Sequence, residues 1–192
     1  MKGVNIFLAD GFEDMEALAT NDVLRRGGVN TQLISITDEP FVCSSHGITV
    51  GVETFLSDID ANHGGTDAKD VMIFPGGMPG TRNLAKCRAL IGLMRDHYAA
   101  GGTLAAICAA PGLVLSQLEE DMSWLEFTCF EGFETELLAR GARYNPVPAV
   151  TCGRVITGRS AGYAIPFALQ VLERVKGVKA VQEVDSALHS VK

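Results

Sequence analysis

The 192-residue sequence lacks any apolar run of the roughly 18 residues that a membrane-spanning helix needs. Its beginning has a short apolar stretch that Asp10 ends, with no small-residue cleavage site behind it. We therefore predict a first strand there and no signal peptide, and we expect no membrane partner. His, Cys and carboxylate residues are not clustered at the spacing of metal ligands, so we also predict no metal site.

The sequence lacks a cysteine pattern typical of disulfides, and it has fewer positive than negative charges. The five cysteines are odd in number, widely spaced and contain no C-x-x-C pair, so no disulfide framework is predicted. Reduced thiols in the cytoplasm are the simpler interpretation. With 16 Lys and Arg against 23 Asp and Glu, the formal net charge is −7. This acidic balance argues against nucleic acid as the main partner.

The composition is typical of a globular protein, with 47% hydrophobic and 20% charged residues. We expect a single domain over residues 1–192. Strand-like and helix-like segments alternate, which predicts an α/β fold with a mostly parallel sheet and helices on both faces. The expected strands are 4–9, 31–36, 70–74, 103–107 and 154–157, with a hairpin or short strand pair within 41–55. The expected helices are 15–26, 84–100, one beginning near residue 111, and 164–175.

The segment 105–111, AAICAAP, places a cysteine between a strand and a helix. The strand is expected to end at Ile107, and Pro111 fits a first helical turn, where a missing N–H costs little. Cys108 would occupy a strained corner near free helix N–H groups, whose partial positive charge lowers the pKa of a thiol. The alternative is a buried structural thiol, because unpaired cysteine is among the most buried residue types.

Glu16 lies in the segment GFEDMEAL, near the start of the predicted helix. It shares a helix stripe with Ala19 and Val23, so its side chain is expected to point partly toward the core. Burial would raise the pKa of this carboxyl and favour the protonated acid, which can donate a hydrogen bond to a thiolate. An ordinary surface acid in a first helical turn is the alternative interpretation.

The segment 74–80, FPGGMPG, follows a buried strand and contains the adjacent glycines Gly76 and Gly77. Glycines let backbone N–H groups face a cavity, which suits an oxyanion hole. A phosphate cradle is a weaker interpretation, because no P-loop lysine follows and the first strand has no G-x-G-x-x-G. A plain tight turn is the third.

Four segments in order resemble the ThiJ/PfpI superfamily of DJ-1-like cysteine proteins: ADGFEDMEAL, DVMIFPGG, AAICAAP and ITGRSAGYAIPFAL. The resemblance covers nearly the whole chain and implies a flavodoxin-like sandwich, usually as a homodimer. It implies that Cys108 is the nucleophile and Glu16 its protonated partner. It also implies that the backbone N–H groups of Gly77 and Ala109 are oxyanion donors, with Arg159 at the pocket rim.

Two positions depart from that family's pattern. Protease-like members have a histidine directly after the cysteine, where this sequence has Ala109, so a Cys-His pair would lose its base. Many members also have a histidine where this sequence has Cys129. Cys129 is expected to pack in the core; the alternative is that it resolves an oxidised Cys108. His46 lies in a stretch that resembles the family's pocket-edge loop.

The residues and the resemblance together predict a cysteine-dependent, cofactor-free enzyme that acts on small reactive carbonyl compounds or glycated side chains, like a glyoxalase or a deglycase. A redox-sensing or chaperone protein, in which Cys108 is oxidised and Glu16 holds the product, is the second hypothesis. An intracellular protease or amidase is the third, and it needs a base such as His46 brought in by oligomerisation.

Overall fold

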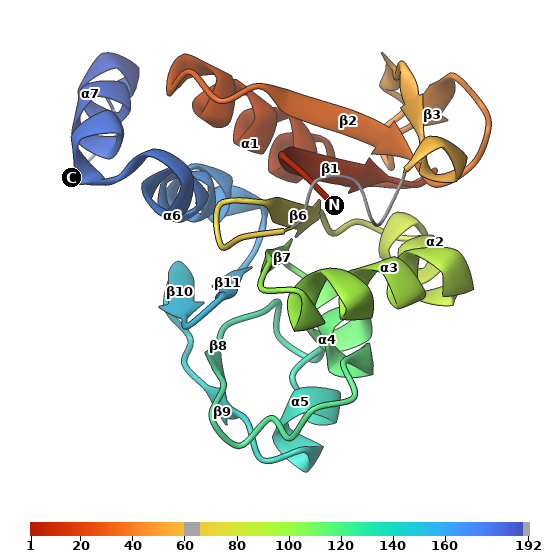
Figure 1. Cartoon of the computed structure of the whole chain (residues 1–192), viewed down its shortest axis with the longest axis vertical. Helices are drawn as coiled ribbons and strands as arrows, with labels where there is room; N and C mark the ends of the chain where they lie inside the picture. Colours follow the sequence, from red (N-terminus) through yellow and green to blue (C-terminus); the bar gives the residue numbers. More distant parts are fainter. Residues whose placement is uncertain (60–65, 190–192) are drawn as a thin grey trace.

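The computed structural model describes residues 1–59 and 66–189 of the chain. Within them, a seven-stranded sheet has the order β10-β11-β7-β6-β1-β2-β5 (Figure 1). Its strands are β1 (Val4–Leu8), β2 (Thr31–Ser35), β5 (Thr54–Phe55), β6 (Val71–Phe74), β7 (Thr103–Ile107), β10 (Ala149–Cys152) and β11 (Val155–Gly158). Neighbouring strands are parallel except β10 and β11, which confirms the predicted mostly parallel sheet.

Helices cover both faces of this sheet, as the alternating pattern predicts. The α-helices of the described residues are α1 (Asp14–Arg26), α2 (Gly80–Lys86), α3 (Arg88–Ala99), α4 (Ala110–Leu113), α5 (Thr135–Ala139), α6 (Ala164–Lys176) and α7 (Val178–Leu188). Figure 1 shows α1 and α6 packed together on one side of the sheet and α2, α3 and α4 on the other. Within the described residues, no helix is both long and apolar enough to cross a membrane.

Strand β1 contributes side chains to two hydrophobic cores, one on each face of the sheet. Successive side chains of a strand point to opposite faces. Ile6 and Leu8 lie in the core beneath α1 and α6, whereas Phe7 lies in the other core and stacks on Phe74 with 5.8 Å between ring centroids. All four side chains are fully buried, and each such burial contributes about 1.5–3 kcal/mol. A strand buried on both faces explains the continuous apolar run in the sequence.

Two small sheets flank the main one. Strands β3 (Phe41–Cys43) and β4 (Thr49–Gly51) form the predicted antiparallel hairpin, and β8 (Glu126–Phe127) pairs in parallel with β9 (Arg143–Tyr144). The hairpin is fastened beside the start of α1, because the Ser45 N–H donates to the carbonyl of Phe12 at 2.8 Å. The hairpin loop therefore lies next to the segment that precedes α1.

The predicted helix 84–100 is wrong as a single element. The chain forms α2 and α3, separated at Cys87, whose ψ of 95° is extended. In one continuous helix Leu84 and Leu90 would lie about 120° apart around the axis, at the edges of one core-facing stripe. With the helix broken between them, both are buried in the same core.

The other expected elements agree with the structure at their centres and differ at their ends. The helix expected near residue 111 is α4, only four residues long and followed by a 3-10 turn at Leu115–Gln117. Helices α5 and α7 and strand β10 have no counterpart in the sequence analysis. The strand expected at 154–157 is β11, which begins and ends one residue later.

Candidate functional site

Cys108 occupies the corner between β7 and α4, with a positive φ of 64°. Few residues other than glycine adopt this conformation, which costs on the order of 1–2 kcal/mol. Two backbone hydrogen bonds hold the corner: the Cys108 N–H donates to the carbonyl of Gly158 at 3.0 Å, and the Phe130 N–H donates to the carbonyl of Cys108 at 2.9 Å. The prediction of a strained corner is confirmed.

Gly76 marks the point where three segments meet. A Cβ atom on this residue would lie 2.5 Å from Oε2 of Glu16, 2.6 Å from Cβ of Cys108 and 3.0 Å from its sulfur. A Cβ atom does not approach other atoms this closely in real proteins, so only glycine fits here without a shift of its neighbours. The ends of β6 and β7 and the first turn of α1 thus bring the carboxyl and the thiol together across one glycine, as the sequence predicted for the edge where parallel strands end.

The Glu16 side chain is buried in this position, with 1% of the residue exposed. The Gly76 N–H donates to its Oε2 at 2.7 Å, and its Oε1 has no nitrogen or oxygen partner among the described residues. Burial raises the pKa of this carboxyl to about 7, although hydrogen bonds from the Cys108 thiol and the Gly76 N–H oppose the shift. The predicted buried acid with a raised pKa is confirmed.

The expected low pKa of the thiol is wrong. Burial raises the pKa of Cys108 well above its ordinary value, and the charge of an ionised Glu16 and its hydrogen bond to the thiol raise it further. The backbone N–H groups of Ala109 and Gly77 lower this pKa, as predicted, but they do not outweigh burial and a neighbouring carboxylate. The sequence indicates the helix terminus, which lowers the thiol pKa. It does not indicate how far burial and the charge of Glu16 raise that pKa.

Glu16 and Cys108 therefore titrate as a pair that holds one negative charge. Two charges in contact inside a poorly solvated site repel strongly, so the second proton leaves far less easily than the first. The single charge lies either on the carboxylate, facing a thiol, or on the sulfur, facing a protonated carboxyl. The second arrangement is a nucleophile with an acid already in contact with it.

The predicted oxyanion donors are the backbone N–H groups of Gly77 and Ala109. Both lower the pKa of the Cys108 thiol, so both are close enough to interact with its sulfur. Gly77 has a φ of +89°, and a Cβ there would lie 2.4 Å from the nitrogen of Glu13. The glycine is required both by its backbone conformation and by close approach. Two donors aimed at one place are what an oxygen developing negative charge needs.

Cys129, the residue in place of the family histidine, is buried in the core beneath α3 and α4. Burial raises the pKa of its thiol to about 12, and the charge of Glu134 adds to the shift. A thiol with this pKa is almost entirely protonated at neutral pH, so it is a poor nucleophile. Its surroundings agree with the favoured interpretation, core packing.

His46 lies on the hairpin loop and is paired with Asp14. Its Nδ1 is 2.6 Å from Oδ2 of Asp14, and this carboxylate raises the pKa of the imidazole. Among the described residues, no hydrogen bond joins a histidine to the Cys108 side chain. His46 therefore lies beside the start of α1 and is paired with Asp14. Its place at the edge of the pocket stays a prediction.

His46 and the start of α1 together form the one grouping of possible metal ligands in the described residues. Single ligand atoms of Glu13, Asp14 and His46 lie within 4.8 Å of one another. Each is already engaged: His46 with Asp14, Asp14 with the Ser44 hydroxyl at 2.5 Å, and Glu13 with the N–H of Glu16 at 2.7 Å. The absence of a metal site stays a prediction.

Arg159 follows the strand β11 and lies in a pocket of about 280 Å³. Its Nη2 donates to Oε1 of Glu131 at 2.5 Å, and its Nη1 donates to the carbonyl of Pro146 at 3.1 Å. The remaining lining residues are Phe130, Ser160 and Tyr163. The position of Arg159 at the rim of the Cys108 pocket stays a prediction. Its pairing with Glu131 is not predicted, because in the sequence Glu131 resembles any other surface acid.

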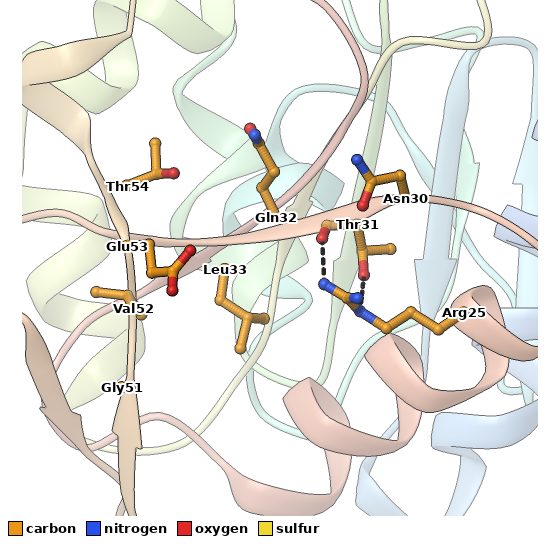
Figure 2. Close-up of a pocket in the computed structure, with 9 residues that line it drawn as sticks. All are labelled: Arg25, Asn30, Thr31, Gln32, Leu33, Gly51, Val52, Glu53 and Thr54. Carbon is orange, nitrogen blue, oxygen red and sulfur yellow. Dashed lines mark hydrogen bonds between the residues drawn. The ribbon is translucent and has the colours of Figure 1, made fainter.

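A second pocket, of about 460 Å³, lies at the opposite end of the strands (Figure 2). It is lined by residues at the amino end of β2 and by the chain between β4 and β5. Its basic side chain, Arg25, is already hydrogen-bonded to the carbonyl of Thr31 at 2.8 Å and to the Thr31 hydroxyl at 3.1 Å. Ligands of parallel α/β sheets bind at the carboxyl ends of the strands, so the corner at Cys108 is the better candidate.

The fold is a flavodoxin-like α/β sandwich, and its site is a cysteine at a strained strand-to-helix corner with a buried carboxyl against it. Together they define a class of cysteine-centred α/β proteins. Within that class the chain belongs to the DJ-1/PfpI family, whose model matches residues 2–174. The resemblance drawn from the four sequence segments is confirmed, as is the fold class.

Individual relatives agree with this assignment. Protein DJ-1 homolog A of Arabidopsis thaliana is 34% identical over 188 residues, which are 97% of this chain and 46% of that protein, so the chain spans about half its length. A Caenorhabditis elegans protein named a glutathione-independent glyoxalase is 30% identical over 165 residues, 86% of this chain and 83% of its own. The crystal structure of a DJ-1 superfamily protein from Salmonella typhimurium has a TM-score of 0.88 and 27% identity, with full coverage of both chains.

Proposed function

We propose that this protein is a cofactor-free enzyme that converts small reactive carbonyl compounds, such as methylglyoxal, at Cys108. The observation that supports this most is the contact between the Cys108 thiol and the buried carboxyl of Glu16, across a glycine that leaves no room for any other residue. The relative named as a glyoxalase supports the same substrate class. Glycated side chains are a second substrate of the same chemical kind, because their early adducts also contain an electrophilic carbon.

The reaction would begin when the Cys108 thiolate adds to the aldehyde carbon. The carbonyl oxygen becomes negative and is stabilised by the N–H groups of Gly77 and Ala109, which lie beside the sulfur. Glu16, protonated when the sulfur carries the charge, gives its proton to this oxygen and forms a hemithioacetal.

The carbon–hydrogen bond of the former aldehyde then breaks, with Glu16 as the base that receives the proton and returns it at the neighbouring carbon. The hydroxyl proton of the hemithioacetal moves to the neighbouring carbonyl oxygen, so that a new carbonyl forms at the carbon bonded to sulfur. This shift converts the hemithioacetal into a thioester of a hydroxy acid. Water hydrolyses the thioester, releases a hydroxy acid such as lactate and returns the thiolate. The net change adds one water to methylglyoxal and needs no oxidant or metal.

A second function, redox sensing, is favoured by one specific feature. Oε1 of Glu16 is buried and has no hydrogen-bond partner within the described part of the chain, and its carboxyl group interacts with Cys108. When protonated, this carboxyl could donate to an oxygen of a sulfinate formed on Cys108 by two equivalents of hydrogen peroxide, each of which is reduced to water. Peroxide-dependent addition of two oxygen atoms to Cys108, without carbonyl turnover, would favour this function.

The dependence of Cys108 reactivity on pH should report the shared proton. The pair loses its first proton near pH 7, the raised pKa of Glu16, so the rate of alkylation by iodoacetamide should rise through pH 7 and then level off. In Glu16→Gln, burial still raises the pKa of Cys108, and the rate should keep rising at higher pH. Mass spectrometry of the Cys108 peptide gives the rate at this residue alone. Identical profiles for both proteins would contradict the shared proton.

We further propose a single domain over 1–192, a cytoplasmic location and a homodimer. Phe41 and Ile48, on the hairpin and its loop, are 66% and 50% exposed, which is unusual for large apolar side chains grouped on one element. Light scattering should give the mass of two 20.4 kDa chains. Phe41→Glu should shift it to one chain, whereas Leu138→Glu, an equally conspicuous exposed residue on α5, should not. A single-chain mass for the unaltered protein would contradict the dimer.

A further inference from the structure

The pocket containing Arg159 is joined to the Cys108 corner through the backbone. One wall, Phe130, donates its N–H to the carbonyl of Cys108, and the other wall follows Gly158, which accepts the N–H of Cys108. One lining residue of the pocket is therefore a hydrogen-bonded neighbour of Cys108, which puts the charges of the pocket close to the corner. The mechanism proposed above uses neither Arg159 nor Glu131.

The charged groups of this pocket cancel each other. Arg159 contributes one positive charge and Glu131 one negative charge, through an ion pair in which the Arg159 side chain is 26% exposed and that of Glu131 is 75% exposed. A substrate carboxylate would have to displace the Glu131 carboxylate from Arg159. This exchange replaces one carboxylate with another, and Glu131 competes at a high effective concentration because it is attached to the same pocket.

The negative charge shared by Cys108 and Glu16 adds to the cost of an anionic substrate, since like charges repel at short range. An uncharged dicarbonyl is not repelled by this negative charge. It can also occupy the pocket without breaking the ion pair between Arg159 and Glu131. The arrangement of charges thus discriminates between substrates of nearly equal size and different charge.

We propose that Glu131 is a specificity-determining residue: by pairing with Arg159 it makes the Cys108 pocket favour uncharged aldehydes, such as glyoxal, over carboxylate-bearing ones, such as glyoxylate. The substrate part of this inference rests on the carbonyl function proposed above. The charge selection itself does not, because it acts on any small molecule that reaches Cys108.

The role of Glu131 can be tested with a variant that changes only its charge. Glu131→Gln keeps the size of the side chain and removes its charge. Arg159 keeps its second hydrogen bond, to the carbonyl of Pro146, so its guanidinium stays in the pocket. The variant should therefore leave an unpaired positive charge next to the corner, free to bind a carboxylate.

The test compares the rates at which iodoacetate and iodoacetamide alkylate Cys108, since these reagents differ mainly in charge. The ratio of the iodoacetate rate to the iodoacetamide rate should rise about 3- to 10-fold in Glu131→Gln, as expected for one charge at a partly exposed site. It should fall in Arg159→Gln. Mass spectrometry of the Cys108 peptide separates this reaction from that of other thiols.

Two further variants identify the cause of any change. Glu136→Gln removes an exposed negative charge from α5 in the same part of the chain and should leave the ratio unchanged. In the double variant Glu131→Gln/Arg159→Gln the rise should disappear, because it depends on the freed guanidinium. An unchanged ratio in Glu131→Gln, or an equal rise in the double variant, would overturn the proposal.

Turnover measurements then separate this inference from the function on which it rests. If the unaltered protein converts glyoxal, Glu131→Gln should improve the ratio of kcat/KM for glyoxylate to that for glyoxal by a similar factor. Turnover with an unchanged alkylation ratio would overturn the role of Glu131 and leave the carbonyl function standing. A shifted alkylation ratio without any turnover would support the charge selection and contradict the carbonyl enzyme.

Discussion

Replacing Cys108 by Ala is expected to lower methylglyoxal turnover at least about 1,000-fold, because the proposed reaction has no other nucleophile. Glu16→Gln is expected to lower it about 100- to 10,000-fold, the usual contribution of a positioned acid or base. The amide keeps the size of the side chain but can no longer pass protons to the hemithioacetal. Lactate formation by the reduced protein, without added glutathione or metal, is the measurement.

The matched control for Cys108→Ala is Cys43→Ala. Cys43 is an exposed, free cysteine on the hairpin, so its loss should leave turnover unchanged. Thermal unfolding of each variant shows whether it is folded, and Cys108→Ser keeps a polar atom at the corner if the alanine variant is unstable. Turnover by Cys108→Ala at the rate of the unaltered protein would contradict the mechanism. No turnover in any protein, with peroxide adding two oxygen atoms to Cys108, would favour redox sensing.

Gly76→Ala is expected to damage the site although both reacting side chains, Glu16 and Cys108, are kept. The added methyl would lie 2.5 Å from Oε2 of Glu16 and 2.6 Å from Cβ of Cys108, so these groups must separate. Displacement by about 1 Å can cost 100-fold in rate, and we expect kcat/KM to fall at least that far. Forcing a methyl into a packed interior should also lower the free energy of unfolding by about 1–3 kcal/mol.

Gly92→Ala provides the comparison for this substitution. Gly92 lies within α3, and a Cβ there would meet no atom within 4 Å. Alanine stabilises a helix interior relative to glycine by about 0.5–1 kcal/mol, so this variant should unfold slightly less readily and keep full activity. Urea unfolding measures the stability of both variants, and kcat/KM for methylglyoxal measures their activity. Normal activity and stability in Gly76→Ala would contradict the close contact of Glu16 and Cys108.

The sequence predicts those parts of the fold and site whose signals are local. The strained corner at Cys108 follows from a strand, a small-residue turn and Pro111 in one short segment. The burial of Glu16 follows from the helical spacing of its neighbours. The parallel sheet follows from alternating apolar strands and helices, and four segments in order are enough to identify the family.

What the sequence does not predict depends on contacts between distant segments. The raised thiol pKa depends on the burial of Cys108 and on its proximity to Glu16, which only the folded chain creates. The break at Cys87 lets Leu84 and Leu90 both reach the core on the same face of the sheet. The pairing of Glu131 with Arg159 joins two segments that are separate in the sequence and next to each other in space.

The two backbone hydrogen bonds at Cys108 also bear on when the site forms during synthesis. The corner is held by Phe130 and by Gly158, both of which leave the ribosome after Cys108. Chains fold progressively from the amino end, so a nascent chain that stops before β11 has the cysteine but lacks the partner that fixes its backbone. Such a chain should contain an ordinary, relaxed thiol. The protein would thus acquire its reactive sulfur only after most of its length has been made and folded.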